Sequence, residues 1–303
     1  MQVLISYKEK ISPALLYALD KLPGEIREGI LSFISRCDIK RVNEIRIKKQ
    51  GYISLIADSK NVITDVYISS KSLDYIVELL CQGSVYAHIN TIREGYISIG
   101  YGIRAGICGQ AIIENGSLCG ITDISSINIR IPQLIENAGN YLFELLKKDG
   151  FSSSVLLFSP PGVGKTTILR GLIHKLSCSS IPLRASVIDT RNEITTCFFE
   201  ELSCDVFLSY PKGKAIEIAT RTMTPQIIIC DEIATKDEAE AILLSTSSGV
   251  SFVATTHANS IDEVMNKKIL KPLLSSHIFD YALGVRRGYG EKRYSYSLHE
   301  LKC

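Results

Sequence analysis

The chain has 303 residues, of which 46% are hydrophobic and 22% are charged, a balance typical of folded rather than disordered chains. Its 34 Lys and Arg against 32 Asp and Glu leave a net charge of +2, too small to draw the whole molecule to nucleic acid or lipid. The sequence shows no apolar run of the roughly 18 to 20 residues that a membrane-spanning helix needs, no signal-peptide pattern and no C-x-x-C pair among its nine Cys. We therefore exclude secreted, transmembrane and zinc-ribbon proteins, and expect a cytoplasmic protein with reduced thiols.

The first 137 residues predict a smaller α+β domain. Apolar residues recur at helical spacing over 26–36, and period-two alternation predicts strands over 42–47 and 52–57. Ser72 is the expected N-cap of a second helix.

Seven glycines between residues 95 and 120 interrupt alternating apolar residues. Asn115-Gly116 is a hairpin signal, so we expect antiparallel strands with bulges in this stretch. A dinucleotide-binding fingerprint is the alternative, but residues 100–105 lack its third Gly or Ala and no helix opens after them.

A helix is predicted over 134–148, and the domain boundary is placed between residues 137 and 138. From there to residue 303, strands alternate with helices, which predicts an α/β fold with a central, mostly parallel sheet and helices on both faces. The expected strands are 155–158, 185–189, 206–209, 226–230 and 250–255, and the expected helices start at 164 or run through 216–222 and 239–247.

A phosphate-binding loop follows the first of these strands. It matches G-x-x-x-x-G-K-[ST] except that Ser replaces the first Gly. The main-chain N–H groups of such a loop converge on the β-phosphate, and the next helix points its positive dipole end there. Lys165 is predicted to bind the β- and γ-phosphates, and the Thr166 hydroxyl to bind Mg²⁺. The predicted nucleotide-binding residues are Ser159, Pro160, Pro161, Gly162, Val163, Gly164, Lys165, Thr166 and Thr167.

Two adjacent acids, Asp231 and Glu232, end the apolar strand 226–230. Acids at the carboxyl end of a buried central strand are costly unless they meet an ion or a substrate. Asp231 is therefore predicted to orient Mg²⁺ and its waters. Glu232 is predicted to polarise the attacking water, which favours hydrolysis over binding alone.

Further polar residues follow the other strands. His257 lies 25 residues after Glu232, and we expect it beside Asp231, where it senses the γ-phosphate or transmits tension between subunits. Asp189 and Glu193 face the same rim, and either positions the water or Mg²⁺ or caps the turn. The chain contains no N-K-x-D guanine-reading motif, which favours ATP over GTP.

The residues after His257 distinguish between classes of P-loop protein. AAA+ ATPases carry a helical lid there, whereas residues 279–298 of this chain predict a closing β-hairpin. This pattern favours a RecA-like P-loop NTPase core, preceded by the smaller α+β domain.

The sequence resembles the stage III sporulation protein AA family, within the type II/type IV secretion ATPase superfamily, from about residue 41 to residue 287. Outside the phosphate loop, the resemblance is carried by residues 43–47, 95–98, 102–109, 124–130, 189–194, 221–225, 231–233 and 254–258.

The resemblance implies a Mg²⁺-dependent ATPase that forms a ring-shaped homo-oligomer, expected to be a hexamer. It implies a protein of endospore-forming bacteria that docks on the mother-cell face of the forespore outer membrane and energises or assembles a channel of membrane-embedded stage III proteins. The N-terminal domain would dock partners or close over the nucleotide. Arg104, Arg130 and Arg221 match arginines that reach phosphates from that domain or from a neighbouring subunit. Ser159 and Thr190 depart from the family pattern, which puts the rate in question.

Two rival functions stay open. RecA-like cores also drive nucleic-acid motors, and residues 265–303 carry eight Lys and Arg against three Asp and Glu. A nucleotide-gated scaffold with negligible hydrolysis is the other rival, and Glu232 is the argument against it. We do not expect nucleic acid to be the partner.

Overall fold

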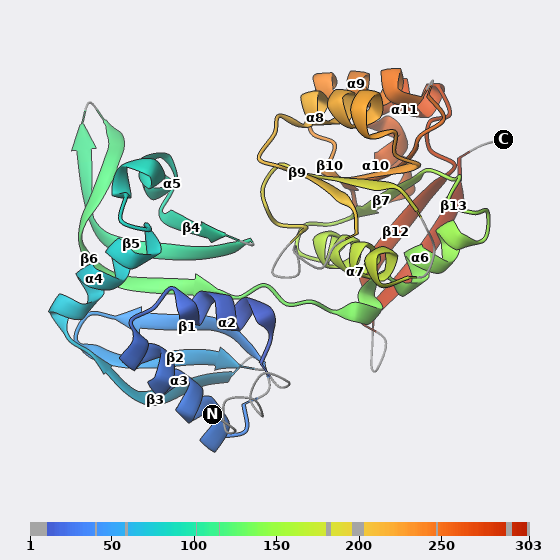
Figure 1. Ribbon diagram of the computed structural model, residues 1–303. Helices are drawn as coiled ribbons and strands as arrows, with labels where there is room; N and C mark the ends of the chain where they lie inside the picture. Colours follow the sequence, from blue (N-terminus) through green and yellow to red (C-terminus); the bar gives the residue numbers. More distant parts are fainter. Residues whose placement is uncertain are drawn as a thin grey trace. The chain divides into compact units, whose positions relative to one another are not determined.

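The computed structural model describes residues 11–39, 41–57, 60–100, 102–114, 116–179, 183–195, 203–246, 248–288 and 293–301. The chain divides into two compact units between Gln133 and Leu134, and each is described by itself (Figure 1). No helix among these described ranges has the length and apolarity to cross a membrane.

The first unit is a six-stranded antiparallel sheet covered by helices on one face. The strand order is β3-β2-β1-β6-β5-β4. Its helices are α2 (Pro13–Asp20), α3 (Gly24–Arg36), α4 (Ser70–Leu80), the 3₁₀ turn η1 (Val85–His88) and α5 (Ile89–Arg93). Its strands are β1 (Val42–Lys48), β2 (Gly51–Ala57), β3 (Lys60–Ile68), β4 (Tyr96–Gly100), β5 (Ile103–Glu114) and β6 (Ser117–Arg130).

One apolar core holds this unit together. Ile45 of β1, Ile129 of β6 and Ala105 of β5 are cross-strand neighbours, are fully buried, and belong to the same core as the buried residues of α2, α3 and α4. Side chains alternate between the faces of a strand, so Glu44, Arg130 and Arg104, which form the next cross-strand row, belong to the opposite face. The antiparallel strands predicted for 95–120 are confirmed, with Gly116 at φ +76° after β5, while Asn115 lies outside the described residues.

The second unit contains a seven-stranded sheet in the order β13-β12-β7-β11-β10-β8-β9. Strands β12 to β9 of this order are parallel, and only β13 is antiparallel to its neighbour. The strands are β7 (Val155–Ser159), β8 (Ala185–Asp189), β9 (Asp205–Leu208), β10 (Ile227–Glu232), β11 (Ser251–His257), β12 (Tyr281–Arg287) and β13 (Tyr294–Glu300). The predicted parallel sheet and closing hairpin are therefore confirmed.

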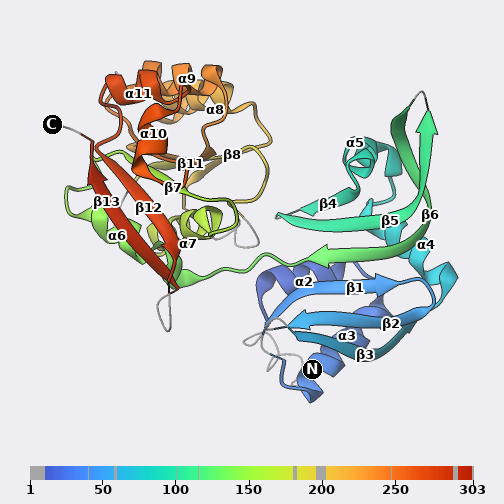
Figure 2. The ribbon, with the colours of Figure 1, turned by 180° about the vertical axis from the view of Figure 1, so that it is seen from behind.

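Helices cover both faces of this sheet, which gives three layers and two apolar cores (Figures 1 and 2). The 3₁₀ turn η2 (Glu136–Gly139), α6 (Asn140–Lys147) and α7 (Lys165–Cys178) share a core with one face. On the other face lie α8 (Lys212–Ile218), the π turn η4 (Ala219–Met223), α9 (Lys236–Thr246), α10 (Ile261–Asn266) and α11 (Lys271–Ser275). This doubly covered parallel sheet is the predicted RecA-like P-loop NTPase arrangement.

Two predicted helix boundaries were wrong. The helix predicted to start after Ser72 begins at Ser70, because Ser69 takes the extended cap conformation and its main-chain oxygen accepts a hydrogen bond from the Ser72 N–H. The helix predicted over 134–148 is regular only from Asn140. The η2 turn comes first, and it brings Gly139 so near α7 that a Cβ on Gly139 would lie 2.2 Å from the main-chain nitrogen of Leu172.

Candidate functional site

The predicted phosphate loop connects the buried strand β7 to the start of α7. Ser159 is the last residue of β7 and is buried, and its hydroxyl donates to the main-chain oxygen of Pro160 at 2.9 Å. Gly162 and Gly164 have φ values of +74° and +126°, which residues with a side chain rarely adopt. A Cβ on Gly164 would also lie 2.5 Å from the Tyr294 hydroxyl. Both glycines are therefore required by the loop geometry.

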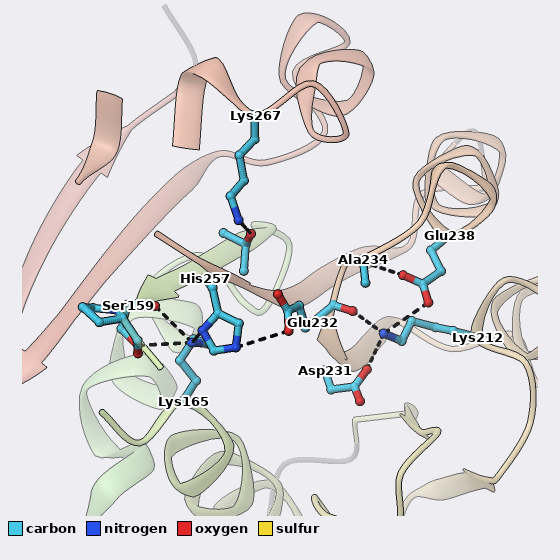
Figure 3. Close-up of polar contacts among 11 residues, drawn as sticks. Ser159, Lys165, Lys212, Asp231, Glu232, Ala234, Glu238, His257 and Lys267 are labelled. Atoms are coloured by element: carbon cyan, nitrogen blue, oxygen red, sulfur yellow. Dashed lines mark hydrogen bonds and ion pairs between the residues drawn. The ribbon is translucent and has the colours of Figure 1, made fainter. Parts of the chain in front are cut away.

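Lys165, the first residue of α7, folds back over this loop. Its Nζ donates to the main-chain oxygen of Ser159 at 3.1 Å and to the Ser159 hydroxyl at 3.3 Å, and lies 2.7 Å from His257 Nδ1 (Figure 3). Burial lowers the pKa of Lys165 to about 8, with Glu232 opposing that effect and Lys267 adding to it. Among the described residues no carboxylate directly contacts this ammonium, which lies at a place where a phosphate would stabilise its charge.

His257 joins Lys165 to Glu232. The parallel strands β7, β11 and β10 are neighbours, and β11 lies in the middle with His257 opposite Ser159 in register. An ammonium has donors only, so Nδ1 accepts from Lys165 and Nε2 carries the ring hydrogen. Nε2 lies 3.3 Å from Glu232 Oε2, within ion-pair distance (Figure 3). Lysine, imidazole and carboxylate therefore form one continuous chain at the carboxyl edge of the sheet.

Asp231 points to a different partner, Lys212, which the sequence analysis missed. Lys212 is the first residue of α8, and its Nζ contacts Asp231 Oδ1 and the main-chain oxygen of Glu232 (Figure 3). Glu238 Oε1 lies 3.6 Å from the same Nζ. Burial raises the pKa of Asp231, and Lys212 opposes that rise. His257 thus contacts Glu232 rather than Asp231, its expected neighbour.

A weak signal for Lys212 does exist in the sequence. Ala215, Ile216 and Ala219 follow it by three, four and seven residues, so all four share one helix face, and the three apolar residues are fully buried. A lysine on the inward face of a helix needs an acidic partner in the interior.

The residues predicted for Mg²⁺ have the right donor chemistry. Thr166 offers a partly exposed hydroxyl on the first turn of α7, and the Asp231 side chain is 21% exposed. Within the part of the chain that the structure describes, no three His, Cys, Asp or Glu side chains cluster as metal ligands. Mg²⁺ keeps several waters and takes few protein ligands when phosphates supply the rest, so a hydroxyl and one carboxylate fit it.

Asp189 caps a turn. Its carboxylate accepts from the N–H groups of Glu193, Ile194 and Thr195 at 2.8 to 2.9 Å, and from the Thr195 hydroxyl at 2.8 Å. Both oxygens of this fully buried carboxylate are used by these bonds. Glu193 lies on the same turn, where its main-chain oxygen accepts from Arg170 Nε at 2.7 Å. The catalytic role predicted for Glu193 stays a prediction.

Two of the three predicted arginines belong to the first unit and the third belongs to the second. Arg104 and Arg130 are cross-strand partners in the first unit. The Arg104 guanidinium lies 4.9 Å from the centre of the Tyr96 ring, and Arg130 Nε lies 3.9 Å from Glu44 Oε1. Arg221 of the second unit is exposed and pairs with Glu217 at 3.0 Å. Their predicted contacts with phosphate stay predictions.

A family model and a protein of similar sequence indicate the same family for this chain. A model of the family described as "Sporulation stage III, protein AA" matches residues 19–296. The chain is 29% identical over 277 residues to "Stage III sporulation protein AA" of Bacillus subtilis (strain 168), which covers 88% of this chain and 89% of that protein.

Solved structures share the fold at low sequence identity. The Legionella pneumophila ATPase DotB has a TM-score of 0.59 and 13% identity, covering 95% of this chain and 80% of DotB. The pilus retraction motor PilT, solved with bound ADP, has a TM-score of 0.62 and 17% identity, covering 89% of this chain and 82% of PilT.

Proposed function

The chain belongs to the sporulation stage III protein AA family, and from that premise we propose that it is a Mg²⁺-dependent ATPase. In this proposal it works as a ring-shaped homo-oligomer, a hexamer, in the cytoplasm at the mother-cell face of the forespore outer membrane. It energises or assembles a channel built from membrane-embedded stage III proteins. The fold that it shares with DotB and PilT, an ATPase and a motor, supports the motor part of the proposal.

One observation carries the proposal: the chain of contacts from Lys165 through His257 to Glu232. A bound γ-phosphate offers the Lys165 ammonium a better partner than the imidazole, because charge-assisted hydrogen bonds to phosphate are stronger. Once Lys165 turns to phosphate, His257 Nδ1 loses its donor while Nε2 stays beside Glu232. The state of the phosphate is thus relayed to the acid at the end of β10.

Each residue of this site then has a task in hydrolysis. The main-chain N–H groups of residues 162–164 hold the β-phosphate, since residues 160 and 161 are prolines without an N–H, and Lys165 neutralises charge on the transferred group. Glu232 accepts a proton from, or orients, the attacking water. Thr166 and Asp231 would hold Mg²⁺ together with the nucleotide, and the ion would supply charge stabilisation for the phosphates.

In this proposal the arginines complete the site, reaching the phosphates from the N-terminal domain or from a neighbouring subunit of the ring. Arg104 and Arg130 form a pair of guanidinium groups on one sheet face, a cation pair suited to bidentate grip of phosphate oxygens. Arg221 is exposed on η4, at a position open to a neighbouring subunit. We assign all three to transition-state charge stabilisation, with Glu193 orienting the water.

The test is steady-state ATP hydrolysis over a range of protein concentrations, with oligomer mass followed by light scattering. We expect the rate per subunit to rise as the ring forms, and to vanish in Lys165→Ala. Arg36→Ala, which breaks an exposed ion pair with Asp65, is the matched control and should leave the rate unchanged.

Two other results would contradict the proposal. Tight ATP binding without turnover at any concentration would favour a nucleotide-gated scaffold. Turnover that appears only with DNA or RNA, and falls steeply with salt, would favour a nucleic-acid motor.

A further inference from the structure

The ammonium of Lys212 is surrounded by acceptors in a nearly closed space. Its side chain is 5% exposed, against 21% for Asp231 and 15% for Glu238. An ammonium has three donors, and it meets three oxygens here, from Asp231, the Glu232 main chain and Glu238 (Figure 3). The Lys212 ammonium therefore lies among three oxygens at the end of β10, of which Glu238 Oε1 is beyond hydrogen-bond distance.

In this arrangement the Lys212 ammonium is a cationic partner of Asp231 that does not depend on a metal ion. Burying a lysine between two carboxylates is favourable only because opposite charges neutralise one another there. Burial alone would lower the pKa of Lys212, but the neighbouring groups of Cys230, Asp231 and Glu238 outweigh it and raise that pKa. The Lys212 ammonium and the Asp231 carboxylate therefore form a buried ion pair.

The same contact conflicts with the role of Asp231 toward Mg²⁺. A divalent cation that approaches this carboxylate meets the positive charge of Lys212, and like charges so close repel each other strongly in a partly buried site. We propose that Lys212 is a positioning residue that competes with Mg²⁺ for Asp231 and thereby sets the Mg²⁺ requirement of nucleotide binding. This inference rests on the proposed function.

Glu238 makes the exchange possible. Its Oε2 accepts from the N–H groups of Ala234 at 2.7 Å and Thr235 at 3.1 Å, which fixes the carboxylate in front of α9. Its Oε1 faces Lys212 at 3.6 Å, longer than a direct hydrogen bond. When Mg²⁺ binds Asp231, the Lys212 ammonium shifts toward the Glu238 carboxylate, which then neutralises its charge.

The experiment measures binding of a fluorescent ATP analogue to the full chain while free Mg²⁺ is varied at fixed nucleotide concentration. In Lys212→Met the competitor is gone, so the half-saturating Mg²⁺ concentration should fall by about threefold or more. Lys212→Arg keeps the charge and should stay close to wild type. Lys214→Met, two residues along on the exposed side of α8, is the matched control and should not move the midpoint.

Glu238→Gln supplies an opposite prediction that does not depend on Lys212→Met folding well. Without the Glu238 carboxylate, Lys212 is held on Asp231, and the half-saturating Mg²⁺ concentration should rise by about threefold. A purely structural role would lower the thermal stability of these variants and leave both midpoints in place.

Two results overturn the inference in distinguishable ways. Unchanged Mg²⁺ midpoints in Lys212→Met and Glu238→Gln, with wild type binding the analogue normally, refute the role of Lys212 alone. No Mg²⁺-dependent binding by wild type refutes the proposed function together with this inference.

Discussion

Replacing Lys165 with methionine is expected to make the nucleotide-free protein more stable. Lys165 is almost fully buried, directly contacts no carboxylate of the residues that the structure covers, and has a pKa lowered by burial from 10.5 to about 8. Methionine has a similar length and no charge, so it removes the cost of burying the ammonium. The charged Lys165 therefore lowers the stability of the nucleotide-free protein. Residues at functional sites commonly lower protein stability in this way.

The size of the gain follows from the shift in pKa. Each pKa unit corresponds to about 1.4 kcal/mol, so the charged form costs roughly 3 kcal/mol near neutral pH. The variant loses two hydrogen bonds to Ser159 and one to His257, and at the lower end of about 0.5 to 1.5 kcal/mol each these offset about 2 kcal/mol. The net gain for Lys165→Met is therefore about 1 kcal/mol.

The sign of the pH dependence separates this cause from any other. Because the folded-state pKa of Lys165 is lower than the unfolded value, the unfolded chain binds the extra proton, and wild type gains stability as pH rises from about 8 toward 10.5. The free energy of unfolding is measured by urea denaturation at about pH 7 and about pH 9.5. Between these two pH values, the free energy of unfolding of wild type should rise by roughly 2 kcal/mol relative to that of the variant.

Lys236→Met is the matched control, because Lys236 is exposed on α9. That variant should show neither the gain nor the pH dependence. The reasoning is refuted if Lys165→Met is less stable than wild type near pH 7, or if the difference between them does not change with pH.

Three further predictions concern packing, the capped turn and proton linkage. Gly171→Ala should lower the free energy of thermal unfolding by about 2 kcal/mol or more, because the new Cβ would lie 2.6 Å from the main-chain nitrogen of Gly139. Gly24→Ala is the control: its Cβ would have open space around it, so the change should be neutral or stabilising. Asp189→Ala should lose about 2 to 3 kcal/mol in urea denaturation, because four donors lose their acceptor; a loss below about 0.5 kcal/mol would contradict the capping role. ATP affinity should be constant below about pH 8 and weaken above it, because a bound phosphate raises the lowered pKa of Lys165. Calorimetry in two buffers should detect proton uptake on ATP binding, and proton release would contradict this prediction.

Much of the candidate site could be predicted because its signals are local in the sequence. The phosphate loop is a contiguous pattern, so the turn into α7 and the glycine conformations follow from residue types alone. Glu232 and His257 each end an apolar strand, and neighbouring parallel strands bring such ends to the same edge.

What could not be predicted depends on contacts between distant segments. Lys212 precedes Asp231 by 19 residues, and only the packing of α8 against the end of β10 reveals that it binds this acid. The helix predicted over 134–148 starts only at Asn140, after the η2 turn that brings Gly139 close to α7, and helical spacing does not reveal that contact.

The arginines show the same limit. A sequence identifies Arg104 and Arg130, and the strand register makes them neighbours. The group that these arginines contact in an oligomer depends on a neighbouring chain, so the sequence of one chain does not predict it.

The most direct test of the central claim is to mix Mg²⁺ and ATP with wild type and with Glu232→Gln, and to measure the nucleotide bound to each protein. The account predicts that wild type converts bound ATP to ADP, while Glu232→Gln binds ATP with similar affinity and retains it unhydrolysed, with turnover at least about 100-fold slower. Equal hydrolysis by both proteins, or no binding by either, would contradict the account.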